Sequence, residues 1–277
     1  MKLPLALKFT VGFLLISCIG WAQNAEKLLK KGQAAFDDGQ YEQAIQLFDK
    51  VITTNELLAQ AYFWRGKSNR NIGQFRKAAV DLSRSIDLDT RNLDVYQERG
   101  LTRYQMGTYA DAVADMNRVI GLSQKKTAFS YKLRGECQFF LQQYDAAAKD
   151  YEQSFRIDST DIDVCYSLAT TLTYLKQFES AIVFYRKGLL LNPKDARMHF
   201  GVGLCKIKAK DFKAAIADFD RAIECDPEMA LAYYNRGMCY YHTDDLDQTC
   251  SNWEKAAALG DPLAKNSLKT YCENRGD

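Results

Sequence analysis

Small residues recur along this chain of 277 residues at a spacing of 34 or 35, and an alanine follows 12 residues after almost every one. The small residues are Gly32, Gly66, Gly100, Gly135, Ala169, Gly203 and Gly237. The alanines are Ala44, Ala78, Ala112, Ala147, Ala181 and Ala215, and the large residues four positions later are Phe48, Leu82, Met116, Tyr151, Tyr185 and Phe219. The last period departs from the pattern with Thr249 and Trp253. A repeat of this length predicts an array of similar structural units.

Each unit is expected to contain two antiparallel helices joined near its fourteenth residue, close to Gly39, Gly73 or Gly107. Residues at equal distances from the turn then face each other. The small residue faces the alanine, and a tyrosine four positions before it faces the large residue. Glycine inside a helix costs about 1 kcal/mol relative to alanine. Its recurrence therefore indicates a close approach of two helix backbones.

This pattern resembles the tetratricopeptide repeat, a 34-residue unit with an aromatic residue, a glycine, a later alanine and a final proline at fixed offsets. Pro193 and Pro227 occupy the proline position in two units, and the earlier units lack it. The resemblance implies an all-α solenoid of helix-turn-helix repeats that form a right-handed superhelix. The seven repeats would occupy 25–58, 59–92, 93–126, 128–161, 162–195, 196–229 and 230–261.

One further helix is expected over residues 262–273, followed by a tail at 274–277. Asp261 is a favourable N-cap, and Pro262 suits the first helical turn. Such a helix caps the face that stacking leaves uncovered on the last repeat.

The N-terminus has the anatomy of a secretory signal peptide over residues 1–22. Lys2 and Lys8 precede or border an uncharged apolar run, and small residues follow at Gly20 and Ala22. The run of 13 residues is short for a permanent membrane-spanning helix. Cleavage after Ala22 predicts an exported protein, in the periplasm or cell envelope of a bacterium.

The four residues "LISC" that end at Cys18 support an alternative, because they resemble a bacterial lipobox. Lipidation at Cys18 would make the chain an outer-membrane lipoprotein, and only then would the chain contact a membrane. The apolar run continues through Ile19 and Trp21, which favours ordinary cleavage and export. Release from the cell, or passage through the secretory pathway of a eukaryote, also remains open.

Arginine precedes glycine in four periods, and in three of them an aspartate follows 16 residues after the arginine. These pairs are Arg65 with Asp81, Arg99 with Asp115, and Arg134 with Asp150. Each is expected to form an ion pair across its own hairpin or to the neighbouring repeat, whereas Arg236 with Asp218 fits only the second arrangement. A ligand-binding role is the alternative. We favour a structural role, because such pairs set geometry while adding little stability when exposed.

The side of each first helix that faces away from its partner helix is the expected binding surface, on the concave face of the solenoid. It carries Lys67 and Arg70 in the second repeat, but from Phe139 to Tyr241 only Asp163 and Arg197 interrupt an apolar stripe. The candidate partner-binding residues are Phe139, Tyr166, Phe200, Leu204, Ile207, Tyr234, Met238 and Tyr241. Either neighbouring helices cover this stripe, or it binds a peptide or protein.

Cys250 and Cys272 lie at equal distances from Asp261, which predicts a disulfide across the last hairpin. The other cysteines after the signal peptide are expected to act as small buried hydrophobes. They are Cys137, Cys165, Cys205, Cys225 and Cys239. Because the mature chain has an odd number of cysteines, at least one thiol stays unpaired or pairs between chains, which leaves a homodimer open.

Charge and motifs argue against nucleic acid, metal, cofactor and catalysis. Lys and Arg number 37 against 35 Asp and Glu, so no strong basic face is indicated. His199 and His242 are the two histidines, and neither stands at metal-ligand spacing. Phosphate loops, nucleophile elbows and HExxH sequences are absent. We therefore expect a non-catalytic scaffold or adaptor of the bacterial envelope, or else a lipid-anchored component of an outer-membrane assembly complex.

Overall fold

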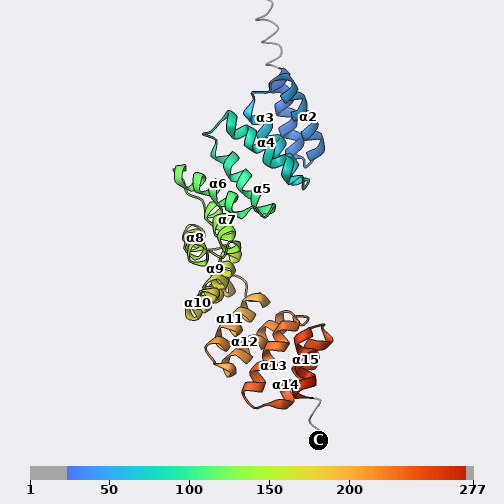
Figure 1. Ribbon diagram of the computed structural model, residues 1–277, viewed down its shortest axis with the longest axis vertical. Helices are drawn as coiled ribbons and strands as arrows, with labels where there is room; N and C mark the ends of the chain where they lie inside the picture. The colour runs from blue at the N-terminus through green and yellow to red at the C-terminus, as the bar shows by residue number, and fades with distance from the viewer. Residues whose placement is uncertain (1–23, 273–277) are drawn as a thin grey trace, which may run out of the picture. The chain divides into compact units, whose positions relative to one another are not determined.

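The computed structural model describes residues 24–272 of the chain (Figure 1). The expected signal peptide at 1–22, the alternative lipidation site Cys18 and the expected tail at 274–277 lie outside the described residues. Within 24–272 the chain folds into helices joined by short turns and forms no strand, so the all-α fold is confirmed. Every helix in this range is too short or too polar to cross a membrane.

The chain divides into two compact units between Lys126 and Thr127. In unit 1, a helix over residues 24–37 precedes α2 (Tyr41–Thr54), α3 (Ala59–Asn71), α4 (Phe75–Leu88), α5 (Leu93–Gln105) and α6 (Tyr109–Leu122). Unit 2 begins with α7 (Ala128–Phe140), α8 (Tyr144–Ile157), α9 (Ile162–Tyr174) and α10 (Phe178–Leu191). It continues with α11 (Ala196–Lys208), α12 (Phe212–Cys225), α13 (Ala230–His242), α14 (Leu246–Ala258) and α15 (Pro262–Tyr271).

The helices alternate between a first and a second helix of each repeat. The first helices α3, α5, α7, α9, α11 and α13 begin at the residues where the sequence pattern starts a new repeat. Helix α15 follows the last repeat, and the carboxylate of Asp261 caps it by accepting a hydrogen bond from the backbone N–H of Ala264 at 2.8 Å. The 34-residue period is therefore the period of a helix pair.

Within unit 2, each helix packs against the next helix along the chain. The first helices also contact one another in order, so that α9 touches both α7 and α11, and α11 touches α13. In unit 1, α3 and α5 make the same kind of contact. The first helices of unit 2 thus form a continuous row, and the residues of the apolar stripe lie on this row.

The recurring glycine makes room for the large residue of the second helix. A Cβ atom on Gly66 would lie 2.9 Å from Cγ of Leu82, and one on Gly203 would lie 2.7 Å from Cε1 of Phe219. The carbonyl oxygen of Ala78 is also close, 3.3 Å from the same added atom on Gly66. The sequence pattern predicted that the glycine lies opposite the alanine, whereas in the structure the glycine also lies under the large side chain.

The turn between the two helices of a repeat needs one residue in the left-handed conformation. Glycine supplies it in the first three repeats, with φ between 75° and 76° at Gly39, Gly73 and Gly107. In unit 2 the same place is taken by Gln142, Lys176, Lys210 and Asp244, with φ between 59° and 61°. Residues with a Cβ atom adopt this conformation at a cost of about 1 kcal/mol or more, so the last four turns are less favourable than the first three.

Candidate functional site

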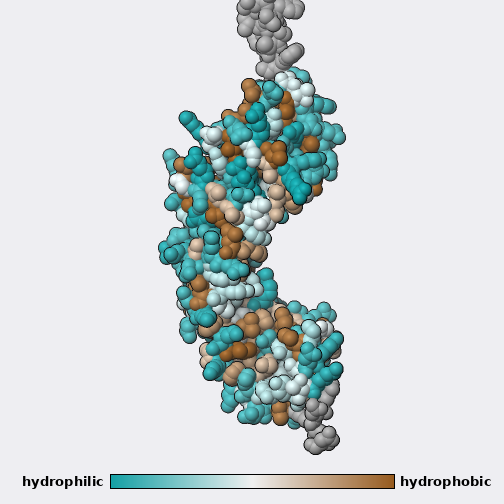
Figure 2. Space-filling view, viewed as in Figure 1, coloured by the Kyte–Doolittle hydropathy of each residue, from teal (hydrophilic) through white to brown (hydrophobic). Residues whose placement is uncertain are grey.

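The candidate binding residues lie on the four first helices of unit 2, and we call them the stripe. Phe139 belongs to α7, Tyr166 to α9, and the remaining six to α11 and α13. All eight side chains are half-buried. Figure 2 shows hydrophobic side chains gathered among polar ones over the part of the molecule that holds α11 and α12. Neighbouring residues therefore cover the stripe in part without removing it from solvent.

Aromatic contacts cover much of the stripe at its α7 and α9 end. The ring of Phe139 packs edge-on against Tyr144 and Tyr174, each at 5.4 Å between ring centroids. Tyr166 lies 6.0 Å from Tyr185 of the second helix. These contacts fix the orientation of the rings, because aromatic pairs prefer edge-on or offset arrangements at such distances.

At the other end, the capping region covers part of the stripe. The rings of Tyr234 and Tyr241 both stack with the ring of Trp253, at 6.3 and 6.1 Å between centroids. Trp253 is fully buried, and its indole N–H donates to the carbonyl oxygen of Tyr234 at 3.2 Å. Tyr271 of α15 lies 5.1 Å from Tyr241. The capping helix thus limits how much of Tyr241 a ligand could reach.

Four large apolar side chains beside the stripe are well exposed. Phe129 and Phe140 on α7 are 41% and 52% exposed, Tyr174 at the end of α9 is 57% exposed, and Leu231 on α13 is 51% exposed. None of these four was among the candidate binding residues predicted from the sequence. A signal was present for Phe129, because it occupies the same position of its repeat as Asp163, Arg197 and Leu231.

The two charged residues that interrupt the stripe are both engaged. The guanidinium of Arg197 lies 5.0 Å from the ring centroid of Tyr166 and binds the carboxylate of Asp195 through two nitrogens, at 2.8 and 3.2 Å. Asp163 faces the ammonium of Lys132 at 3.8 Å, and the same ammonium donates to Asp161 at 2.9 Å. Arg197 is therefore locally neutralised, while one lysine serves two carboxylates at the start of α9.

The three arginine–aspartate pairs predicted at a spacing of 16 residues form. Two guanidinium nitrogens of each arginine bind both oxygens of the aspartate 16 residues later, at distances between 2.6 and 3.0 Å. Arg65 also binds Asp49 of the preceding repeat at 2.7 Å, and Arg99 binds Ser83 of the preceding repeat at 3.1 Å. The two arrangements considered as alternatives therefore occur together at Arg65 and Arg99, which connect neighbouring second helices.

The expected pairing of Arg236 with Asp218 is wrong. Arg236 binds Asp220 of the preceding repeat at 2.5 Å and the side-chain oxygen of Asn252 in its own repeat at 2.7 Å. Asp218 instead faces Lys206 of its own repeat at 2.5 Å. The actual partner lies two residues after the expected one in the sequence. In the preceding repeat, the residue that contacts the arginine comes about half a helical turn after the aspartate that faces inward.

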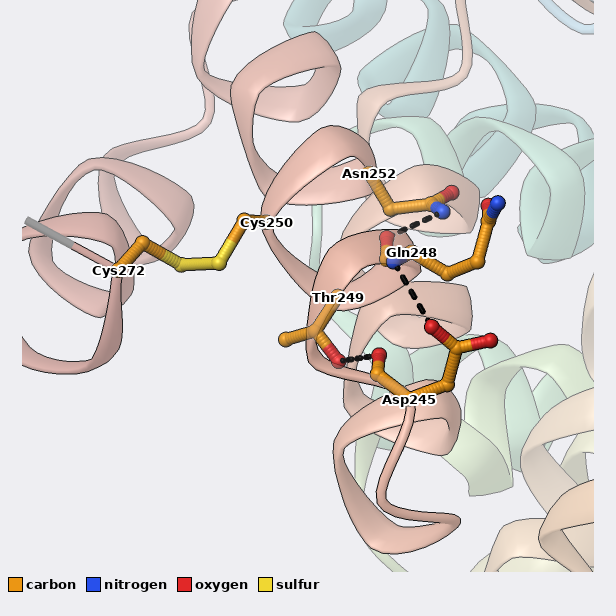
Figure 3. Close-up of a disulfide and its surroundings, with 6 residues drawn as sticks. All are labelled: Asp245, Gln248, Thr249, Cys250, Asn252 and Cys272. Atoms are coloured by element: carbon orange, nitrogen blue, oxygen red, sulfur yellow. Dashed lines mark hydrogen bonds between the residues drawn. A yellow bond between two sulfur atoms is a disulfide. The ribbon is translucent and has the colours of Figure 1, made fainter. Parts of the chain in front are cut away.

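The C-terminal cysteines are joined to each other. Sγ of Cys250 on α14 lies 2.05 Å from Sγ of Cys272, which follows the last residue of α15 (Figure 3). Beside this bond, Asp245 caps α14 by accepting from the backbone N–H of Gln248 at 3.1 Å. The covalent link therefore attaches the capping helix to the second helix of the last repeat.

Four of the remaining cysteines are buried and Cys225 is half-buried. Burial raises the pKa of Cys137 and of Cys239 to about 12. A thiol with such a pKa stays protonated near neutral pH and is a poor nucleophile. Residues 24–272 also contain no group of three or more His, Cys, Asp or Glu side chains placed to hold a metal ion.

Solved structures with a similar arrangement of helices include tetratricopeptide repeat proteins. The C-terminal part of a repeat-containing protein from Cytophaga hutchinsonii aligns with a TM-score of 0.74 at 18% identity, over 87% of this chain and 99% of that one. A tetratricopeptide repeat protein from Parabacteroides merdae aligns with a TM-score of 0.62 at 17% identity, over 89% and 98%. MamA from Desulfovibrio magneticus aligns with a TM-score of 0.58 at 16% identity, over 61% and 95%. At these identities the likeness concerns the fold alone.

Family profiles match most of the helical part of the sequence. One tetratricopeptide repeat profile matches residues 29–91, 166–230 and 206–261, and a second matches residues 130–161. No curated protein sequence gives a significant match. The matched segments span both compact units, and they coincide with helix pairs that pack in sequence order. The chain belongs to the tetratricopeptide repeat family.

Proposed function

We propose that this protein is a non-catalytic scaffold that binds a peptide or a segment of another protein along the first helices of unit 2. The half-exposed stripe and the exposed apolar side chains beside it support this proposal. Apolar surface of this kind marks interaction sites on proteins that are otherwise well packed. Repeat proteins present such surfaces as extended rows, and peptides bind them through spaced anchor side chains.

The four exposed apolar side chains carry the proposal. Phe129, Phe140, Tyr174 and Leu231 lie at or next to the stripe and are between 41% and 57% exposed. Each would gain about 1 to 2 kcal/mol from covering its apolar area, on the scale of 25 cal/mol per Å². Their helices are fixed by packing on second helices, so little backbone order would be lost on binding.

We further propose that the protein works outside the cytoplasm, in the cell envelope of a bacterium. The sequence of residues 1–22 supports export, and a link between Cys250 and Cys272 suits an oxidising compartment. The alternative is a lipid-anchored component of an outer-membrane assembly complex, which the sequence ending at Cys18 favours. Intact mass of the mature chain distinguishes these, because cleavage after Ala22 and diacylation of Cys18 give different products.

Site-specific photo-crosslinking in the producing organism tests the binding surface. The photoreactive residue would replace Phe200 or Tyr234 on the stripe, and Leu231 beside it. Matched controls would replace Lys149 of α8 and Arg186 of α10, which are exposed on second helices. We expect one discrete adduct from the stripe positions and none from the controls.

Formation of the adduct should also depend on the apolar character of the surface. A second substitution, Leu231→Asp, should abolish the adduct formed at Phe200 while leaving the thermal stability of the protein unchanged, since Leu231 is 51% exposed. Equal adducts from stripe and control positions, or none from any position, would show that this surface is not where a partner binds.

A further inference from the structure

The row of first helices in unit 2 changes its chemistry along its length. Helices α11 and α13 contribute apolar side chains: Phe200, Leu204, Ile207, Leu231, Tyr234, Met238 and Tyr241. Helix α7 and the start of α9 contribute the charged side chains Lys132, Glu136, Asp161 and Asp163. A ligand that follows the row therefore meets an acidic region at one end and an apolar region at the other.

The acidic region has more carboxylates than cations. The ammonium of Lys132 donates to Asp161 at 2.9 Å and lies 3.8 Å from Asp163. Asp161 additionally accepts hydrogen bonds from the backbone N–H groups of Asp163 and Val164, so its position is fixed by capping α9. Asp163 is well exposed, and Lys132 lies too far from it for a hydrogen bond. With Glu136 included, the acidic region holds three carboxylates and one ammonium group. Lys132 therefore leaves two unit negative charges unbalanced.

Glu136 adds a carboxylate that the local fold does not satisfy. It is half-buried one turn after Lys132 on α7, and within residues 24–272 its carboxylate forms neither a hydrogen bond nor an ion pair. Its pKa is raised, mainly by burial and further by Asp161 and Asp163, while Lys132 acts in the opposite direction. A charged group held in a partly desolvated site with like charges nearby is typical of functional positions.

The fold itself does not require an acid at this position. The residues that correspond to Glu136 in the other repeats are Gln33, Lys67, Leu101, Thr170, Leu204 and Met238. Neutral and apolar side chains are therefore compatible with the same helix packing. The packing of the repeat therefore does not account for a carboxylate at Glu136, whereas binding of a cationic ligand would.

Exposed aromatic rings flank the acidic region on the same helix. Phe129 lies one turn before Lys132, and Phe140 lies one turn after Glu136; these rings are 41% and 52% exposed. A lysine or arginine side chain of a ligand would find carboxylates for its charge and aromatic surface for its aliphatic stem. Cation–π contacts with such rings add about 0.5 to 1 kcal/mol at exposed sites.

We propose that the natural occupant of the stripe is a basic–apolar peptide segment, with a lysine or arginine against Glu136 and Asp163 and with aliphatic or aromatic side chains against α11 and α13. This rests on the proposed function, since it specifies the ligand of the same surface. The carboxylates select the cationic end of the peptide by charge complementarity, and the apolar side chains of α11 and α13 select the rest of the peptide.

Selection from a random 12-residue peptide library on the immobilised full chain tests this ligand class. We expect enriched peptides to combine at least one lysine or arginine with two or more large apolar residues. Synthetic versions of these peptides are then measured by fluorescence anisotropy against the wild-type chain and three variants: Glu136→Gln, Glu152→Gln and Leu231→Asp. Glu152 is the matched control, because it lies on α8, the second helix of the same repeat.

Glu136→Gln should weaken binding of the basic peptides by roughly three- to tenfold and reduce the dependence of affinity on salt. Glu152→Gln should leave affinity unchanged, and replacing the peptide's cation by glutamine should remove the difference between wild type and Glu136→Gln. Enriched peptides that are neutral or acidic, or basic peptides insensitive to Glu136→Gln, would overturn the ligand assignment.

The two proposals fail in different ways. If the enriched peptides lose binding with Leu231→Asp but carry no cation, the stripe is a binding surface and the acidic region is not part of it. If none of the enriched peptides responds to Leu231→Asp or to Glu136→Gln, the stripe is not the binding surface, and both proposals are wrong. Circular dichroism of each variant confirms that the helices are intact before binding is compared.

Discussion

The guanidinium of Arg65 binds the carboxylate of Asp49, a residue of the preceding repeat, at 2.7 Å. The same guanidinium binds both oxygens of Asp81 in its own repeat. This one side chain thus connects two second helices, α2 and α4. The connection does not require the backbones of the two helices to pack directly against each other. Asp81 is nearly inaccessible to solvent, whereas Asp49 is exposed.

These two contacts should have different energies. In double-mutant cycles of unfolding free energy, Arg65→Leu with Asp81→Asn should show a coupling of about 2 kcal/mol, because removing one partner leaves a buried carboxylate with a single remaining donor, Asn69. Arg65→Leu with Asp49→Asn should show less than about 1 kcal/mol, because solvent screens that pair. Urea unfolding measures both cycles, and equal couplings would refute the distinction.

The left-handed residues of the unit 2 turns offer a stabilising substitution. Lys176 has φ of 61° and carries a Cβ atom, so Lys176→Gly should raise the free energy of unfolding by about 0.5 to 1 kcal/mol. Gly73→Ala is the matched opposite change at φ of 76° and should lower it by a similar amount. Thermal unfolding followed by circular dichroism measures both, and a destabilising Lys176→Gly would contradict the argument.

The link between Cys250 and Cys272 should stabilise the C-terminal end of unit 2. The two cysteines are 22 residues apart in the sequence, and closing a loop of this size stabilises the folded state by about 3 kcal/mol in the chain-entropy description. Reduction, or Cys272→Ser, should therefore loosen α15 at lower temperature than the rest of the unit.

Trp253 provides the measurement, because its ring is fully buried and lies 5.9 Å from that of Tyr271 on α15. In a Trp21→Phe, Trp64→Phe background, its emission should shift to longer wavelength at lower temperature once the bond is reduced. Cys225→Ser should cause no such change, because Cys225 has no disulfide partner among the described residues. Emission that is indifferent to reduction would show that the bond does not hold the capping helix.

Glu136 should reduce stability near neutral pH. Its folded-state pKa is raised above the ordinary value, so the folded protein holds this proton more tightly than the unfolded chain does. The stabilising effect of protonation is complete below the unfolded pKa of roughly 4.3 and is lost as pH rises through the folded pKa. Glu136→Gln should therefore stabilise the protein at pH 7, by about 1 kcal/mol or less, and have little effect at low pH.

Urea unfolding of wild type and Glu136→Gln at pH 7 and at pH 3.5 measures this difference, with Glu152→Gln as control. The groups that act on Glu136 are Lys132 on its own helix and Asp161 and Asp163 at the start of α9. A Glu136→Gln variant less stable than wild type at pH 7 would mean that the carboxylate has a structural partner, and would remove one argument for its role in binding.

The fold could be predicted from sequence because the same packing constraint on the two helices recurs in each repeat. A glycine beneath a large side chain, such as Gly66 beneath Leu82, leaves one way for the two helices to pack, and the period repeats that geometry. The pairs of Arg65, Arg99 and Arg134 with their own aspartates followed from the same spacing. All of these contacts lie within one hairpin, where distance along the chain determines distance in space.

Contacts between repeats were harder to predict. The pairing of Arg236 with Asp220 depends on how one hairpin is displaced along the next, and the spacing within a hairpin does not contain that displacement. Glu136 was missed for a similar reason. A glutamate in a helix looks like a solvated residue until the start of α9, with Asp161 and Asp163, is placed beside it.

The row of first helices has a consequence for the mechanics of unit 2. Among the first helices of unit 2, contacts join α7 to α9, α9 to α11 and α11 to α13, so strain or local opening at one repeat acts directly on the adjacent repeats. A ligand bound along the row would contact several of these helices at once and would restrain their motion relative to one another. Amide hydrogens at both ends of the row would then exchange with solvent at rates that rise and fall together, instead of increasing independently toward each end.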